Sequence, residues 1–518
     1  MSRTLYRHNR IWTGSPESPW TTALLVADGV ILAVGDDALA AGGDELVDLP
    51  GELVMPGLHD AHIHTEWQSR DLSSVDLREA GSLEEALGLI RVHLETMAPG
   101  EPLHSGRWNS NRWAVPVQPD RHALDSVCPD RIAMLDSVDG HTLWVNSLAL
   151  HRAGITRDTP DPVGGEIVRD PDGEPTGILR ESAPELVKSV TGEGVPPLRP
   201  WLERLQEWLV SVGLTAITDI DGEDARAAYA EMHAAGALRL RVHKCVRQDD
   251  LELAISEGRR ARQGDQMFQV GPVKFFSDGA LGSHTAHMTQ PFIGHEGCGI
   301  AVTPYPVLVE RIRMAVKAGL DVATHAIGDE ANRLVLDAFG TMRAEGFDNI
   351  LRVEHAQHLR LADVPRFREL GVIASMQPSH CTADLELADE IIGDRPLASY
   401  AWRTMLDAGA ALAFGSDAPV EDPNPFYGLH AAVTRQRADG VPPGGWRPEE
   451  RITLDEAVRA HTVGAYEAVG RTDVGRLAVG QLADFIAVDR DLWSVEPAAI
   501  RDTRVLQTVV GGEVVFTR

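Results

Sequence analysis

The sequence predicts an α/β protein: a (β/α)8 TIM barrel with a small β-sandwich domain built from both chain termini. Two observations predict this fold. From about residue 54 to residue 420, short apolar runs alternate with longer helical stretches, the pattern of a parallel sheet with crossover helices. Similar strand-like runs also lie near both ends of the chain. Because isolated hairpins are marginal in water, we expect these terminal runs to pair with one another.

The chain is long enough for more than one hydrophobic core. Single cores stop growing at about 250–300 residues, and this chain has 518, of which 43% are hydrophobic and 24% charged. We therefore expect a soluble protein with one large domain that carries additions, or with a second, smaller domain.

Eight apolar runs end in polar residues, as the strands of a barrel do where active groups lie. In chain order they cover residues 53–64, 215–219, 238–243, 270–276, 320–325, 350–355, 372–377 and 411–417. The gap between the first and second runs is far longer than one crossover requires. It predicts an α/β insertion after the first barrel strand.

These patterns give approximate domain boundaries. We expect a composite β-sandwich of residues 1–54 and 468–518, a barrel domain over residues 55–467, and an insertion that acts as a lid over residues 70–200. A lid beside a barrel mouth commonly shapes specificity.

Charge and composition exclude several classes of partner. The formal net charge of -29 repels phosphate backbones and anionic membranes, so we expect neither nucleic acid nor membrane as a partner. The sequence carries no secretory apolar stretch near residue 1, and no apolar run reaches the length of a membrane span. The four cysteines, which form no CxxC pair, are Cys128, Cys245, Cys298 and Cys381. We expect a cytoplasmic protein.

The predicted strand ends carry a set of metal-binding side chains. Imidazoles and carboxylates are ligands that suit divalent ions, and several converging at one barrel rim could hold two ions. The set comprises His62, His64, Lys274, His325, His355 and Asp417.

Lys274 does not fit this set as an ammonium group, because its charge would repel metal ions. Carboxylation of the side-chain nitrogen removes the conflict, since the resulting carbamate is an anion with two oxygens able to bridge two ions. Taken singly, each residue has a structural alternative. His325 or His355 could be a hydrogen-bonded core histidine, Asp417 a helix N-cap, and Lys274 the partner of Asp278.

The chain resembles the metal-dependent amidohydrolase superfamily over nearly its whole length. The landmarks are residues 55–64 (MPGLHDAHIH), Gly415-Ser416-Asp417 and the tail at residues 475–485. Three further motifs are similar to the branch that contains N-substituted formamide deformylases (amidohydrolase family 3). They are residues 274–283 (KFFSDGALGS), residues 139–147 with His141, and Ser375-Met376-Gln377-Pro378.

The resemblance implies a function for each matched position. It implies a metal-dependent hydrolase that cleaves a non-peptide C–N bond, such as an amide or N-formyl bond, with a metal-activated water. The metal ligands would be the six strand-end residues, with N6-carboxylysine at Lys274 and with Asp417 as the base. His141 would orient the substrate carbonyl. Candidates for substrate binding are Asp278, Arg180, Trp108, Trp113, His284 and Gln377. Related sequences usually carry arginine at position 284, so His284 departs from the pattern.

Two other functions stay open. A one-metal deaminase of the same superfamily typically has a glutamate three residues after the fifth-strand histidine, where this chain has Gly328. A non-catalytic barrel scaffold would have lost ligands, whereas all six positions are filled here. We expect two zinc ions per chain, with manganese and iron also compatible, a small-molecule substrate, and a homodimer.

Overall fold

The computed structural model describes residues 2–72, 74–97, 100–104, 106–110, 113–115, 117–138, 142–162, 165–188 and 197–518. The chain divides into two compact units. One contains residues 1–65 and 202–518, and the other contains residues 66–201. Among the described helices, none has both the length and the apolar character needed to cross a bilayer.

The larger unit contains the predicted parallel barrel sheet. Over the described residues, eight strands follow the order β20-β18-β16-β15-β14-β13-β12-β6, and every neighbouring pair is parallel. The strands are β6 (Leu58–Ile63), β12 (Leu214–Asp219), β13 (Arg241–Arg247), β14 (Phe268–Phe276), β15 (Val322–Ala326), β16 (Leu351–His355), β18 (Val372–Met376) and β20 (Ala411–Phe414). The expected fold class is thereby confirmed.

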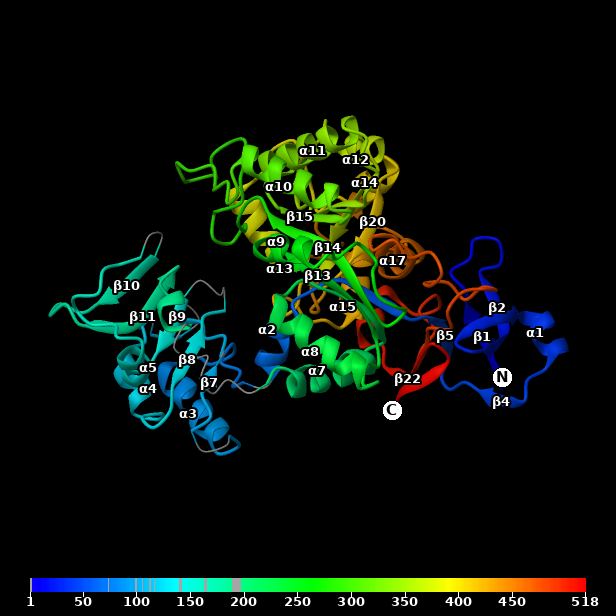
Figure 1. Cartoon of the computed structure of the whole chain (residues 1–518), viewed down its shortest axis with the longest axis horizontal. Coiled ribbons are helices and arrows are strands. Elements are labelled where there is room, and N and C mark those ends of the chain that lie inside the picture. The colour runs from blue at the N-terminus through cyan, green and yellow to red at the C-terminus, as the bar shows by residue number, and fades with distance from the viewer. Residues whose placement is uncertain are drawn as a thin grey trace. The chain divides into compact units, whose positions relative to one another are not determined.

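Helices alternate with these strands, as the crossover pattern requires. They are α7 (Arg199–Ser211), α8 (Glu223–Ala234), α9 (Leu251–Ser256), α10 (Tyr305–Lys317), α11 (Asp329–Ala344), α12 (Val364–Leu370), α13 (Pro378–Ile391), α14 (Trp402–Asp407), α15 (Pro425–Thr434), α16 (Leu454–Arg459) and α17 (Ala465–Glu467). The short strands β17 (His358–Arg360) and β19 (Leu397–Ser399) pair beside the barrel sheet. Figure 1 shows the barrel strands from green β13 to yellow β20.

The first and last barrel strands meet just beyond their carboxyl ends. Ile63 forms a parallel bridge with Ala418, and the Asp417 amide donates a hydrogen bond to the His62 carbonyl oxygen at 2.7 Å. The Asp60 carboxylate accepts hydrogen bonds from both the amide and the hydroxyl of Ser416. These contacts close the barrel at the end where its polar side chains lie.

Strands from both ends of the chain share one sheet, in which blue N-terminal strands lie beside red C-terminal strands (Figure 1). In the described residues it contains β1 (Arg3–Trp12), β2 (Trp20–Ala27), β3 (Val30–Val34), β4 (Glu45–Asp48), β5 (Leu53–Pro56), β21 (Phe485–Val488), β22 (Val505–Val510) and β23 (Glu513–Thr517). Helix α1 (Gly35–Ala41) follows β3. β5 pairs with both β1 and β21, so it joins the two ends.

The run over residues 53–64 is two strands rather than one. β5 belongs to the terminal sheet and β6 to the barrel, and Gly57 separates them. A Cβ atom at Gly57 would lie 2.2 Å from the Thr215 side chain, so only glycine permits this close approach. Both strands are fully buried and follow one another with only Gly57 between them, which is why the sequence pattern alone does not divide them.

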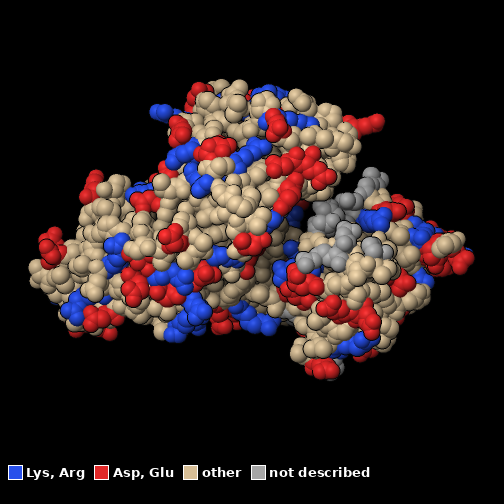
Figure 2. Space-filling model, turned by 180° about the vertical axis from the view of Figure 1, so that it is seen from behind, with Lys and Arg blue, Asp and Glu red and all other residues tan. Residues whose placement is uncertain are grey.

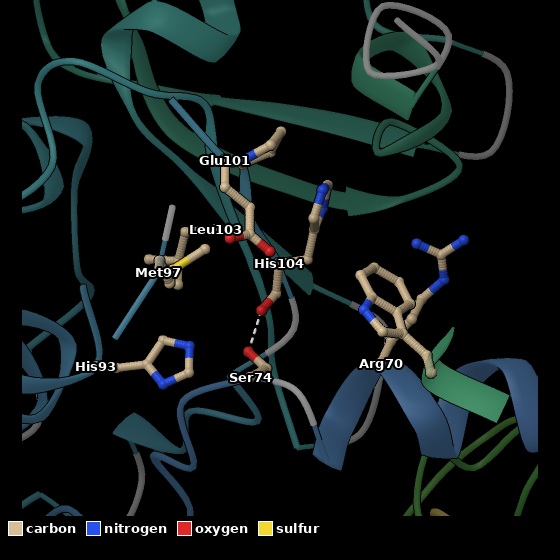
Figure 3. Close-up of a pocket in the computed structure, with 9 residues that line it drawn as sticks. Arg70, Ser74, His93, Met97, Glu101, Leu103 and His104 are labelled. Carbon is tan, nitrogen blue, oxygen red and sulfur yellow. Dashed lines mark hydrogen bonds between the residues drawn. The ribbon is translucent and has the colours of Figure 1, made fainter. Parts of the chain in front are cut away.

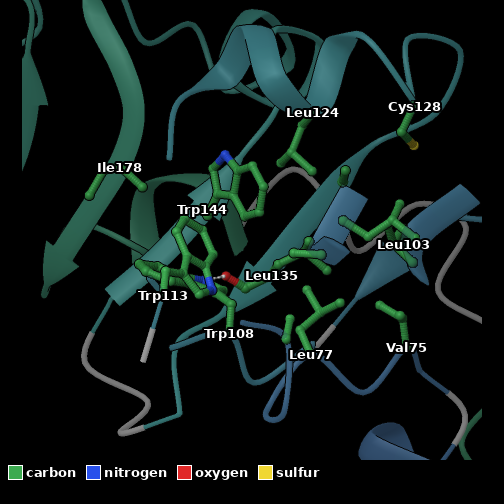
Figure 4. Packing of buried hydrophobic residues seen from close by; sticks show 14 residues of the cluster. Val75, Leu77, Leu103, Trp108, Trp113, Leu124, Cys128, Leu135, Trp144 and Ile178 are labelled. Atoms are coloured by element: carbon green, nitrogen blue, oxygen red, sulfur yellow. Dashed lines mark hydrogen bonds between the residues drawn. The ribbon is translucent and has the colours of Figure 1, made fainter. Parts of the chain in front are cut away.

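The second unit has its own sheet and core. Its described strands follow the order β10-β11-β9-β8-β7 and are β7 (Leu103–His104), β8 (Ala133–Asp136), β9 (Thr142–Val145), β10 (Gly165–Arg169) and β11 (Pro175–Glu181). Its helices are α2 (Thr65–Leu72), which begins at the last residue of the larger unit, α3 (Leu83–Leu94), α4 (Arg121–Asp125), α5 (Ser147–Arg152) and α6 (Glu185–Lys188). Its core gathers Trp108, Trp113 and Trp144 around Leu135 (Figure 4).

A small pocket of this unit encloses His104. Its volume is about 20 Å³, and Arg70, His93, Glu101 and His104 are among its lining residues (Figure 3). The Ser74 hydroxyl donates a hydrogen bond to the His104 carbonyl oxygen, whereas the buried Nε2 of His104 has no partner among the described residues. Burial, assisted by the charge of Arg70, lowers the pKa of His104 to about 4.

We therefore predict that acid destabilises this unit through His104. An unfolded histidine has a pKa near 6.5, so the unfolded chain binds the extra proton first as the pH falls. The contribution is present above about pH 6.5 and is lost progressively as the pH approaches 4, by up to about 3 kcal/mol. Urea unfolding between these pH values should show a shallower pH dependence for His104→Gln than for the native chain. Exposed His122 provides the control, because His122→Gln should keep the native dependence. An unchanged pH dependence in His104→Gln would contradict the assignment.

Candidate metal centre

The barrel brings the six sequence-predicted ligands to one place. Four of them, His62, Lys274, His325 and His355, lie at or near the carboxyl ends of β6, β14, β15 and β16. His64 directly follows β6, and Asp417 lies three residues after the end of β20. Four of the six residues are buried, and the other two, His64 and His325, are partly buried. Unpaired polar groups are costly at such depth, so the cluster requires mutual contacts or a bound ion.

The His62 side chain occupies the centre of this cluster. Its Nε2 atom lies 3.2 Å from Lys274 Nζ and 3.2 Å from Asp417 Oδ1. His64 Nε2 lies 3.4 Å from the same Asp417 oxygen. The ring centroid of His355 lies 4.9 Å from that of His62 and 4.5 Å from that of His325. All six side chains therefore surround one small volume.

Two of the imidazoles are oriented by carboxylates that sequence reasoning did not select. His62 Nδ1 lies 2.7 Å from Glu354 Oε2, and His64 Nδ1 lies 3.0 Å from Asp221 Oδ1. A carboxylate that accepts the Nδ1 proton leaves the lone pair of Nε2 available to a metal ion. Both Nε2 atoms face Asp417.

The other two imidazoles have amide or carbonyl oxygens as their nearest acceptors, and Asp278 Oδ1 also lies 3.4 Å from His325 Nε2. His355 Nδ1 lies 3.0 Å from Gln377 Oε1, which leaves Nε2 available. His325 has the opposite arrangement, since its Nε2 lies 3.0 Å from the Gly279 carbonyl oxygen and Nδ1 remains. Burial lowers the pKa of His325 to about 3 and that of His355 well below its ordinary value. Neutral imidazoles with one fixed nitrogen are the form that ligates metals.

Glu354 itself is held by a buried arginine. Arg352 lies on the same strand, and its Nε lies 2.5 Å from Glu354 Oε1, with both side chains fully buried. Although burial raises the pKa of Glu354, Arg352 and His62 lower it well below its ordinary value. Glu354 is therefore a carboxylate that accepts the His62 proton. The available sequence signal for Glu354 was its position directly before the strand-end histidine His355.

Lys274 is fully buried, and this burial lowers the pKa of its amine. A neutral amine is the form that reacts with carbon dioxide to give a carbamate. The donor set of four imidazoles, one carboxylate and this amine therefore fits a divalent metal centre, provided that Lys274 becomes anionic.

His380, at the start of α13, is a further residue that sequence reasoning missed. Its Nε2 lies 3.2 Å from Asp417 Oδ2 and its Nδ1 lies 3.3 Å from Glu421 Oε1. Burial alone would lower its pKa, but hydrogen bonds to Asp417 and Glu421 raise it to about 10. His380 thus binds the Asp417 oxygen that faces away from His62. Its position just beyond the seventh strand was the available signal.

The remaining candidates in this unit have defined surroundings. Asp278 is buried and accepts hydrogen bonds from three backbone amides, at His287, Ile327 and Gly328. The His284 ring lies 4.2 Å from the ring of His295, and its backbone has a positive φ of 57°. Gln377 keeps a buried amide nitrogen without a partner among the described residues.

The candidates in residues 66–201 lie in that separate unit. Trp108 and Trp113 are packed in its core, and the Trp108 indole donates a hydrogen bond to the Leu135 carbonyl oxygen (Figure 4). Arg180 pairs with Glu166 at 2.8 Å. His141 lies outside the described residues.

A parallel barrel with clustered histidines and a carboxylate at its closed rim defines a metal-dependent hydrolase of the TIM-barrel class. The sequence model of the amidohydrolase family matches residues 45–516. The chain therefore belongs to the amidohydrolase family, whose members include hydrolases of non-peptide C–N bonds.

Individual relatives agree with this membership. The protein LONG AFTER FAR-RED 3 of Arabidopsis thaliana is 32% identical, over 99% of this chain and 91% of its own. The N-substituted formamide deformylase of Arthrobacter pascens is 30% identical, over 96% of this chain and 95% of its own. The crystal structure of an uncharacterized metal-dependent hydrolase from Pyrococcus horikoshii OT3 superposes with a TM-score of 0.83 at 26% identity. The match covers 96% of this chain and 99% of that chain. The branch inferred from sequence motifs is confirmed.

We predict that Glu354→Gln weakens metal binding without removing a ligand. The amide cannot hold the His62 proton as a carboxylate does, and it leaves Arg352 without its charge partner. Loss of such a partner typically costs about 10–100-fold in metal affinity. Competition with a chromophoric chelator measures this affinity. The control is Glu330→Gln, a partly exposed glutamate on α11 that pairs with Arg333. Native affinity in Glu354→Gln would show that Glu354 does not orient His62.

Proposed function

We propose that this chain hydrolyses a small N-acyl or N-formyl amide at a centre of two divalent ions, with zinc as the expected metal and manganese or iron also compatible. His62, His64, Lys274, His325, His355 and Asp417 would be the ligands. The observation that carries the proposal is the convergence of four imidazoles on one small volume, each with one ring nitrogen fixed by a neighbouring acceptor. The named activity of the deformylase relative supports the choice of bond.

The ions, when bound, would lower the pKa of a water molecule and polarise the carbonyl group of the substrate. Asp417 would accept the proton of that water on its carboxylate and later return it to the leaving nitrogen. His380 fixes the rotation of this carboxylate, because its Nε2 binds Oδ2 while Oδ1 faces His62 and His64. Asp417 also has a positive φ of 58°, a strained backbone that the barrel closure supports.

Lys274 would act as a carbamate. Its neutral amine would form a C–N bond with carbon dioxide and release one proton, which gives an anion with two oxygens. Because Lys274 Nζ lies 3.2 Å from His62 Nε2, these oxygens would lie near the other proposed ligands.

Substrate contacts and assembly form part of the same proposal. We retain three candidates for substrate contact, which are Gln377, His284 and His141. Four others are weaker, because their described side chains have structural partners: Asp278, Arg180, Trp108 and Trp113.

We also propose a cytoplasmic homodimer. The four free cysteines support a reducing compartment.

The Asp417→Asn variant tests the base. The amide keeps an oxygen toward His62 but cannot accept a proton, so we expect turnover of N-formyl and N-acyl amides to fall by at least about 10²-fold. Metal content measured by inductively coupled plasma mass spectrometry should stay near that of the native protein. Undiminished hydrolysis would overturn the assignment of Asp417. A native content of one ion per fully active chain would favour the one-metal deaminase instead.

The Lys274→Ala variant tests the bridge. We expect metal content to fall although all four histidines remain, because the anionic bridge is lost. Short carboxylic acids such as propionate should restore part of the metal content, since they can occupy the space of the carbamate. Lys317→Ala provides the control, because Lys317 is an exposed lysine at the end of α10, and this variant should keep its metal. Full retention of both ions in Lys274→Ala without added acid would contradict the carbamate.

A further inference from the structure

A second polar pocket lies in the larger unit, apart from the metal centre. Its volume is about 520 Å³, and segments from α15, from the helical turn at Pro497–Asp502 and from β22 line it. Four arginines contribute to its wall, together with one acidic residue, Asp502. The arginines are Arg490, Arg501, Arg504 and Arg518. None of the six metal-site residues takes part in it.

Unpaired arginines are unexpected in this protein. The chain has 77 acidic and 48 basic residues, and basic side chains stand beside acidic ones over much of the visible face (Figure 2). Arg490 follows this rule, because it pairs with Asp489 at 3.0 Å. Among the described residues, however, no carboxylate lies within ion-pair distance of Arg501, Arg504 or Arg518. The pocket wall thus holds three guanidinium groups without an ion-pair partner among the described residues and a single side-chain carboxylate, that of Asp502, which leaves the wall net positive.

Local contacts hold several of these guanidinium groups in place. Arg501 stacks over the Tyr427 ring, with its central carbon 4.7 Å from the ring centroid. Arg490 donates a hydrogen bond to the Ala499 carbonyl oxygen at 3.0 Å, and Arg518 donates one to the Val505 carbonyl oxygen at 2.9 Å. Each of these contacts occupies only part of a guanidinium group, which has five N–H donors. The remaining donors are available to a ligand.

The chemistry of the wall indicates the class of ligand. Guanidinium groups match the oxygens of phosphate in a bidentate manner and stay charged at all physiological pH values. The volume lies in the range of small-molecule sites, but the wall is mainly polar, which disfavours an apolar ligand. We propose that this pocket binds a small phosphorylated molecule with two or more negative charges. Such a ligand would neutralise the unpaired arginines, and its site is independent of the proposed hydrolysis.

Isothermal titration of the metal-loaded protein with fructose 1,6-bisphosphate tests the site. We expect one binding event per chain that weakens as salt is added, since the pocket is open to solvent. In the double variant Arg501→Gln/Arg504→Gln, the affinity should fall by at least about tenfold, which corresponds to about 1.4 kcal/mol. The affinity of the double variant Arg501→Lys/Arg504→Lys should lie between that of the native protein and that of the glutamine double variant, because lysine keeps the charge but loses the bidentate geometry.

The matched control removes the same charge elsewhere on this unit. Arg403→Gln/Arg437→Gln eliminates two arginines that are paired with Glu456 and Glu386, and it should bind like the native protein. Equal weakening in both glutamine double variants would show a general charge effect and overturn the proposal. Native affinity in Arg501→Gln/Arg504→Gln would place the ligand elsewhere, such as at the metal centre, and would also overturn it, as would a lack of binding to the native protein. Thermal unfolding of each variant confirms that the fold is intact.

Discussion

The metal centre depends on the closure of the barrel between its first and last strands. The backbone hydrogen bonds from Asp417 to His62 and from His64 to Ala418 join segments that are more than 350 positions apart in the chain. Asp60 reinforces the closure by accepting two hydrogen bonds from Ser416. Without these contacts, Asp417, the proposed base, and the histidines of the first strand would lie at opposite edges of an open sheet. Closure therefore creates the site as well as the fold.

A buried charge network then gives the site its ligand geometry. Arg352 keeps Glu354 ionised, and Glu354 holds the Nδ1 proton of His62, so that Nε2 faces Lys274 and Asp417. Burial of two charges is costly, and a partner left alone is destabilising by several kcal/mol. The network is thus better explained by the orientation of a ligand than by stability alone. His380 orients the Asp417 carboxylate in a similar way, because its Nε2 lies within hydrogen-bond distance of Oδ2.

Sequence reasoning selected the six proposed ligands, which the structure brings together, because a barrel strand reveals its active end through a polar residue after an apolar run. It did not find Glu354, Asp221 or His380, which act on the ligands through contacts with residues 37 to 292 positions away. It also read residues 53–64 as one strand, since only Gly57 separates the two buried strands. The division at Gly57 follows from the close approach of Thr215, which is a tertiary contact.

The sequence by itself determined the fold class and the family, and it selected the six proposed ligands, because strand periodicity and strand-end chemistry are local properties. Only the tertiary structure decided which nitrogen of each imidazole is fixed by an acceptor, which oxygen of Asp417 faces His62, and where the partners of these groups come from. It also gathered four arginines that are spread over residues 490–518 around one pocket with Tyr427. Hydrogen-bond direction and charge neutralisation depend on distances in space, which a local pattern cannot contain.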